Sequence, residues 1–213
     1  MTNTDPASPV TNRPAPFGAA FRPVLVAAQA DAPWAYQRLF EWLGRPVAGY
    51  LRGQGADDAE GLANDVFLRV FTKLRGFEGG EERFRSWVFT IAHNLLVDQR
   101  RSRRRQPLMT DHPLAEVPSN RSTESDALAR LGAARVRTLL GELTPDQRDV
   151  LLLRIVADLT VEQVAEALGK PPGAVKQLQR RALHALRRRL GDDEEGGEQA
   201  RTHSGSSDVR AQR

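Results

Sequence analysis

Residues 159–190 constrain the fold of this chain more than any other segment. Thr160 followed three positions later by Gln163 has the spacing of a capping box, which predicts a helix that begins near Val161. Gly169 suits the left-handed residue that ends a helix, and the two prolines after it suit the start of the next one. The segment therefore predicts two helices joined by a tight turn.

The second of these helices is strongly basic on one side. Its apolar residues recur at helical spacing and are expected to face a core: Val175, Leu178, Ala182, Leu186 and Leu190. Its cations are expected to lie outside that core: Lys176, Arg180, Arg181, Arg187, Arg188 and Arg189. A basic helix presented by a partner helix suits the major groove of DNA. A helical hairpin with a solvated basic face fits the same residues, so this segment alone leaves both interpretations open.

Length and composition limit the class of protein. A chain of 213 residues allows one domain or two small ones, and 40% hydrophobic with 27% charged residues is ordinary for a soluble protein. The absence of cysteine excludes disulfides, thiolate zinc sites and cysteine nucleophiles, and the four histidines have no metal-ligand spacing. No apolar run approaches the roughly 18 residues of a membrane span, and the N-terminus is a poor signal peptide. We therefore expect a cytoplasmic protein without a metal or other cofactor.

The pattern along the chain predicts an all-α fold with two small helical domains. Residues 1–28 lack helical periodicity and are expected to be a disordered extension, and residues 29–106 form a first helical block. Residues 107–126 are rich in proline and are expected to be a flexible linker. Residues 127–190 form a second block that ends in the helix-turn-helix, and residues 191–213 are expected to be a disordered acidic tail.

The first block combines three unusual features. A helix carries an acidic face, an aromatic cluster follows it, and five arginines then occur among residues 100–105. The acidic face comprises Asp57, Asp58, Glu60 and Asp65, and the cluster comprises Phe77, Phe84, Trp87 and Phe89. Aromatic rings beside cations suit single-stranded DNA, because stacking contributes about 1–3 kcal/mol per base. That is comparable to the few kcal/mol needed to extrude a base from the duplex.

Three segments resemble, in order, the signatures of the extracytoplasmic-function (ECF) group of bacterial RNA polymerase sigma factors. They are DAEGLANDVFLRVF, FRSWVFTIAHNLLVDQRRSRRR and LTVEQVAEALGKPPGAVKQLQRRALHALRRRL. The resemblance covers about residues 24–190. It implies that residues 29–106 are sigma region 2, which binds core polymerase and recognises and melts the −10 element. It implies equally that residues 127–190 are region 4, which recognises the −35 element, and that catalysis belongs to the polymerase.

The resemblance also implies roles for individual residues. Those implied to bind the clamp helices of the largest polymerase subunit are Asp58, Glu60, Leu62, Asp65, Val66, Phe67 and Val70. Those implied to bind the −10 element are Phe77, Phe89, Asn94, Arg100, Arg101, Arg103 and Arg104, whereas Trp87 and Ile91 are expected to be core residues. Those implied to bind the −35 element are Gly173, Ala174, Lys176, Gln177, Arg180 and Arg181.

Some positions depart from the pattern of the family. Thr90 stands where many members carry arginine, and Ala174 replaces a common threonine. Gln177 and Leu178 replace a frequent serine and arginine in the recognition helix. Leu178 cannot hydrogen-bond a base edge, so it either packs inward or contacts a thymine methyl group. These departures leave the promoter sequence open.

The implied partners are core RNA polymerase, through its clamp helices and flap, promoter DNA and an anti-sigma factor, with no membrane insertion. One alternative is a helix-turn-helix regulator that binds DNA without acting as a sigma factor, although it leaves the acidic helix and the aromatic cluster without a role. A recombinase or nuclease needs a nucleophile or a carboxylate metal cluster facing DNA. Tyr36 and Tyr50 lie on an apolar stripe away from the basic segments, so we do not expect an enzyme.

Overall fold

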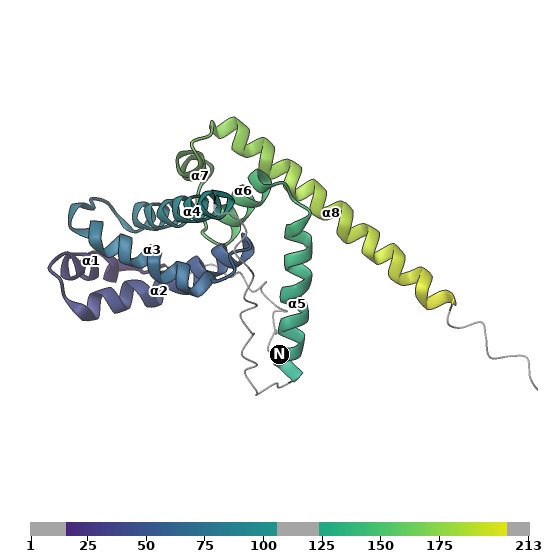
Figure 1. The fold of residues 1–213 in the computed structure, drawn as a ribbon, viewed down its shortest axis with the longest axis horizontal. Helices are drawn as coiled ribbons and strands as arrows, with labels where there is room; N and C mark the ends of the chain where they lie inside the picture. Colours follow the sequence, from purple (N-terminus) through teal and green to yellow (C-terminus); the bar gives the residue numbers. More distant parts are fainter. Residues whose placement is uncertain (1–15, 106–123, 204–213) are drawn as a thin grey trace, which may run out of the picture.

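The computed structural model describes residues 16–105 and 124–203, and every regular element in that part of the chain is helical. The first domain contains α1 (Phe21–Gln29), α2 (Pro33–Gly53), α3 (Ala59–Lys73) and α4 (Glu81–Arg105), with the 3-10 helices η1 (Gly18–Ala20) and η2 (Leu74–Gly76). The second contains α5 (Glu124–Gly141), α6 (Pro145–Ile155), α7 (Val161–Leu168) and α8 (Pro172–His203). Figure 1 shows α8 projecting from the body of the molecule. The predicted all-α, two-domain class with a helix-turn-helix is confirmed.

The first domain is built around α2, which packs against α1 and α3, while α4 packs on α3. Leu39, Leu43, Val47 and Tyr50 recur every three or four residues along α2 and are completely buried. The helix continues through Pro46, as the continuous stripe predicts. The core of this domain is therefore a layer of aliphatic and aromatic side chains between α2, α3 and α4.

The second domain begins its helices where the cap residues predict. Thr144 and Thr160 each accept a hydrogen bond from the backbone N–H three residues later, and Gln147 and Gln163 each accept one from the cap N–H, so both capping boxes are complete. Gly169 ends α7 with φ 62°, the left-handed conformation that glycine adopts without strain. The α7–α8 pair is the predicted helix-turn-helix.

Three boundaries differ from the sequence prediction. The expected disorder of residues 1–28 is wrong from residue 16 onward, because Phe21, Val24, Leu25 and Ala28 form a buried stripe along α1. Residues 1–15 lie outside the described residues. Of the expected linker, residues 107–123 also lie outside them, and α5 begins at Glu124.

The expected disorder of residues 191–213 is likewise wrong as far as His203, where α8 ends. An established helix extends at little cost, and the glutamate, glutamine and alanine residues after position 193 are good helix formers. Residues 204–213 lie outside the described part of the chain.

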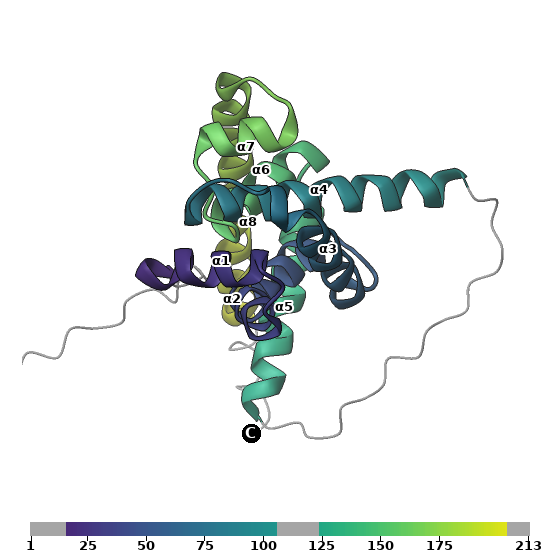
Figure 2. The same ribbon diagram turned by 90° about the vertical axis from the view of Figure 1, so that its left-hand side faces the viewer.

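The two domains pack directly against each other. Helix α7 contacts α4, helix α6 contacts α2, and one hydrophobic cluster continues across both domains. Figures 1 and 2 show α7 beside α4 from two directions. The helix-turn-helix therefore lies against the helix that carries the aromatic cluster and the arginines.

Candidate nucleic-acid interface

The first half of α8 presents one polar face to solvent. Val175 and Ala182 are completely buried against the domain core, while Lys176, Gln177, Arg180 and Arg181 are exposed. Leu178 is partly buried and packs on the core, which favours the inward position over contact with a thymine methyl group. Gly173 and Ala174 lie in the first turn, where the helix dipole attracts a phosphate, and the Ala174 N–H donates to the Pro171 carbonyl over 2.9 Å. The structure thus brings all six predicted −35 residues to one helix end.

One residue beside that face was not predicted from the sequence. His184 is exposed one turn beyond Arg180, and the two line a shallow hollow together with Arg181 and Arg188. The i, i+4 spacing of Arg180, His184 and Arg188 was the available signal. The cationic face therefore extends past the four residues predicted to contact bases.

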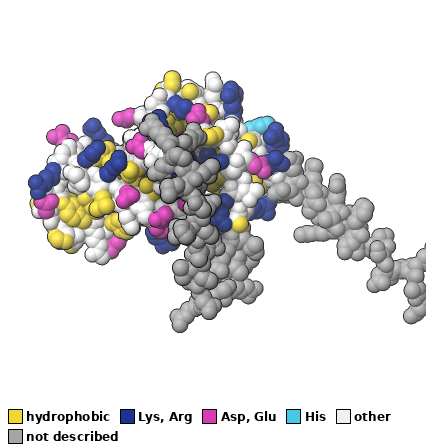
Figure 3. Space-filling view, in the orientation of Figure 1, with side chains coloured by type: hydrophobic (Ala, Val, Ile, Leu, Met, Phe, Trp, Pro, Cys, Tyr) yellow, Lys and Arg dark blue, Asp and Glu magenta, His cyan; other side chains and the backbone are white. Residues whose placement is uncertain are grey.

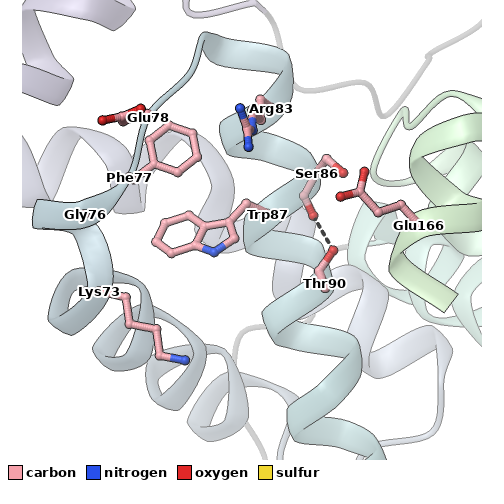
Figure 4. Close-up of a pocket in the computed structure, with 9 residues that line it drawn as sticks. All are labelled: Lys73, Gly76, Phe77, Glu78, Arg83, Ser86, Trp87, Thr90 and Glu166. Atoms are coloured by element: carbon pink, nitrogen blue, oxygen red, sulfur yellow. Dashed lines mark hydrogen bonds between the residues drawn. The ribbon is translucent and has the colours of Figure 1, made fainter. Parts of the chain in front are cut away.

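An open pocket of about 510 Å³ lies beside the aromatic cluster. Phe77 and Trp87 stack with their ring centroids 5.0 Å apart and their planes 30° apart. Figure 4 shows both rings at the pocket, with Lys73 from α3 and Arg83 from α4 on its walls. A flat aromatic surface between two cations suits a base whose phosphates are held on either side.

Trp87, expected to be a core residue, is half-buried and lines this pocket, as does Thr90, whose hydroxyl donates to the Ser86 carbonyl over 2.9 Å. Phe89, predicted to contact the −10 element, is 0% exposed and packs edge-to-face on Tyr50. That prediction for Phe89 is wrong, because the helix turns its ring into the core. Phe77 is also largely buried, so Trp87 is the more exposed ring of the stacked pair.

The arginines at the end of α4 differ in exposure and in the groups that they contact. Arg101 is exposed, as is Asn94 about two turns earlier on α4. Arg100 is half-buried and donates to the Gln54 backbone carbonyl over 2.5 Å, and Arg103 pairs with Asp57. The Arg104 side chain lies outside the described residues. Of the three arginines predicted to bind the −10 element whose side chains are described, Arg101 and Arg103 are exposed, and Arg103 is engaged by Asp57.

Only some of the residues on α3 that were predicted to bind the clamp helices of the polymerase are exposed to solvent. Its four apolar members, Leu62, Val66, Phe67 and Val70, are buried in the core and offer no surface to a partner. Direct contact by these four is therefore a wrong prediction, since they hold the helix in place. Asp58 caps α3 by accepting from the Gly61 N–H over 2.8 Å, and Glu60 pairs with Arg52.

Asp65 is exposed, and the apolar residue beside it on the same face is Leu68, which is 65% exposed. Two further apolar side chains of this domain, Trp34 and Phe40 of α2, are also exposed, and the Phe40 ring contacts the Phe67 ring. Figure 3 shows hydrophobic side chains gathered on the left part of the face in view, where Figure 1 places α2 and α3. In the sequence, the single leucine on this polar face, Leu68, could have indicated the surface.

No group of three or more His, Asp or Glu side chains in the described ranges is placed to hold a metal ion. No helix within those ranges is long and apolar enough to span a bilayer.

Comparison with known proteins matches both domains. Residues 35–106 match the family "Sigma-70 region 2" and residues 139–188 match "Sigma-70, region 4". The chain is 34% identical over 169 residues to the ECF RNA polymerase sigma factor BldN of Streptomyces coelicolor, covering 78% of this chain and 64% of BldN. It is 35% identical over 141 residues to the ECF sigma factor ShbA of Streptomyces griseus, covering 64% of this chain and 74% of ShbA.

A solved structure has a similar fold. CnrH, in complex with the cytosolic domain of CnrY, aligns with a TM-score of 0.61 and 25% identity over 82% of this chain and 99% of CnrH. Both sigma regions are thus present, in order, with the cationic helix and the aromatic pocket that the sequence signatures imply. The chain belongs to the extracytoplasmic-function group of RNA polymerase sigma factors.

Proposed function

We propose that this protein binds core RNA polymerase and directs it to promoters by recognising the −10 and −35 elements. The observation that carries the proposal is the match to regions 2 and 4 in order, with an exposed basic helix in one and an aromatic pocket in the other. The chain itself contributes specificity and strand capture, and the polymerase contributes catalysis. Its place of action is the bacterial cytoplasm, where polymerase and chromosome are.

The −35 element is recognised as duplex DNA by the start of α8. Arginine and lysine pair with guanine edges in the major groove, and glutamine pairs with adenine. Lys176, Gln177, Arg180 and Arg181 supply these groups from one exposed face. The Gly173 amide and the positive end of the helix dipole fix the helix on a phosphate, and Ala174 lies beside them in the first turn.

The −10 element is held as a single strand at the pocket of the first domain. An extruded base stacks on Trp87, whose ring is backed by Phe77, and this stacking contributes about 1–3 kcal/mol. Lys73, Arg83 and Arg101 are exposed cations that attract the strand backbone. Stacking at this one site is comparable to the free energy needed to unstack a base.

The clamp helices of the polymerase dock on the exposed face of α3, where Asp65 supplies charge and Leu68 supplies apolar area. The flap of the polymerase contacts the second domain. An anti-sigma factor is a further expected partner, since CnrH was solved in complex with the cytosolic domain of CnrY. Such a partner acts by covering these same surfaces.

Run-off transcription with purified bacterial core polymerase tests the proposal, and sequencing of the RNA 5′ ends identifies the promoters. We expect promoter-dependent transcripts and co-migration with core polymerase on a sizing column. Clean DNA binding without promoter-dependent RNA would favour the alternative, a helix-turn-helix regulator. The paired variant R180A/R181A should lose −35-dependent transcripts while still co-migrating with the polymerase.

A further inference from the structure

A small cavity of about 210 Å³ lies between the start of α4 and the start of α7. It is smaller than the pockets of about 300–1,000 Å³ that hold drug-sized ligands, so it suits a molecule of few heavy atoms. Its lining side chains are all polar, and none of them has a role in promoter or polymerase binding above. They are Glu82 and Arg85 of α4, Arg154 of α6, Asp158 of the following turn, and Thr160 and Gln163 of the α7 capping box.

Two arginines of this cavity carry buried hydrogen-bond donors without a partner. Among the buried side-chain nitrogen and oxygen atoms of residues 16–105 and 124–203, those that make no hydrogen bond are Arg85 Nε and Arg154 Nε. Arg85 is only 6% exposed, and both arginines line the same cavity. A buried donor that stays unpaired is costly, so two at one cavity indicate an acceptor that binds there.

Other contacts hold the two guanidinium groups in place. Arg85 Nη1 donates to Asp158 over 3.1 Å, and its Nη2 lies 3.7 Å from the Glu81 carboxylate. Arg154 Nη1 donates to the Leu159 carbonyl. Asp158 has φ 53°, a left-handed conformation that aspartate and asparagine adopt more readily than most residues. The cations of the site are therefore positioned before any ligand binds.

The start of α7 adds further donors to the cavity. Thr160 Oγ1 accepts from the Gln163 N–H over 3.2 Å, and the Gln163 side-chain oxygen accepts from the Thr160 N–H over 2.8 Å. The capping box thus uses an oxygen of each side chain as an acceptor. The hydroxyl hydrogen of Thr160 and the amide hydrogens of Gln163 remain able to donate to a ligand.

The charges around the cavity select the kind of acceptor. Arg85 and Arg154 contribute two positive charges, and Glu82 and Asp158 contribute two negative charges. A phosphate dianion would be attracted by the first pair and repelled by the second, so it gains little net attraction. A molecule with one carboxylate and one ammonium group has charged hydrogen-bond partners for both groups.

We propose that this cavity binds a small polar α-amino acid. Its carboxylate accepts from Arg85 and Arg154, and its ammonium group donates to Asp158 and Glu82. Because the lining has no apolar side chain, an amino acid such as serine fits better than one with a large apolar side chain. The inference goes beyond the proposed function and does not depend on it.

Calorimetric titration of the full chain, in a buffer free of phosphate, tests the site with four probes. L-Serine carries both charged groups, 3-hydroxypropionate lacks the ammonium group, ethanolamine lacks the carboxylate, and inorganic phosphate is the competing oxyanion. We expect serine to bind and each of the other three to bind at least tenfold more weakly, because each leaves charged groups of the cavity unpaired.

Two variants with matched controls assign the binding to this cavity. R154K keeps the charge but removes the Nε donor, and its control is R148K, an arginine of the same helix whose Nε donates to the Leu140 carbonyl. D158N keeps the shape and the left-handed turn but removes the charge, and its control is D31N, at an aspartate with φ 61° outside the cavity. The Kd for serine should rise at least tenfold in R154K and D158N and stay within twofold of the parent in both controls.

Failure of all four probes to bind would overturn the site. Serine binding that R154K and D158N leave unchanged would overturn its location, and phosphate, ethanolamine or 3-hydroxypropionate binding as tightly as serine would overturn the ligand class. Circular dichroism identifies an unfolded variant, and the second variant keeps the test decisive if the first unfolds. No measurement uses polymerase or promoter DNA, so the outcome is separate from that of the run-off experiment.

Discussion

Leu68→Ala tests which face of α3 docks on the polymerase. Complete burial of a leucine side chain contributes about 1.5–3 kcal/mol. Leu68 is 65% exposed, so about two thirds of that contribution, roughly 1–2 kcal/mol, remains available to a partner. At 1.4 kcal/mol per tenfold, the Kd for core polymerase should rise about five- to thirtyfold. The melting temperature should stay close to that of the parent.

The neighbouring residue provides the matched control. Phe67 is 2% exposed, and Phe67→Ala should reduce the free energy of unfolding by about 3–5 kcal/mol because it leaves a cavity between α2 and α3. Titration of dye-labelled protein with core polymerase gives the Kd, and circular dichroism gives the melting temperature. If Leu68→Ala changes the Kd by less than twofold, the docking surface lies on another face and the reasoning is refuted.

Three further predictions concern DNA and pH. R180A/R181A should weaken binding to −35 duplex and make the slope of log affinity against log salt shallower by about 0.9 for each lost phosphate contact, which a salt titration checks. Trp87→Ala should weaken promoter opening by the equivalent of about 1–3 kcal/mol, measured by permanganate reactivity, while Phe89→Ala should lower thermal stability instead. Burial lowers the pKa of His93 in the folded protein below its ordinary value of 6.5, so the stability linked to neutral His93 is fully present above pH 6.5 and is lost as the pH falls through the lowered pKa. The melting temperature should therefore fall as the pH is lowered from about 7.5 to 5, and His93→Gln should flatten that response.

Local chemistry made the second domain predictable. A capping box is satisfied within four residues, and a left-handed glycine ends a helix whatever packs around it. The exposed positions of Lys176 and Arg180 follow from the same helical period, because Val175 and Ala182 fix which side faces the core. These features need no knowledge of distant parts of the chain.

The first domain was predicted less well because its helices carry apolar residues on more than one side. Phe89 and Trp87 are two positions apart on α4, and periodicity separates their faces without saying which is buried. Their assignment depends on Tyr50 packing against Phe89 and on Phe77 packing against Trp87. Contacts with α2 and with the loop before α4 are therefore what decide it.

The contact between domains combines the close approach of Leu152 to Gly53 at the end of α2, other aliphatic side chains and a buried polar network. A buried hydrogen bond such as Gln54 to Asp149 adds little net stability because water replaces it on opening, yet it excludes partners that leave either group unpaired. The close approach at Gly53 further restricts which surface can pack there. The interface is thus specific because its apolar packing and its hydrogen-bonded groups must both match the partner surface.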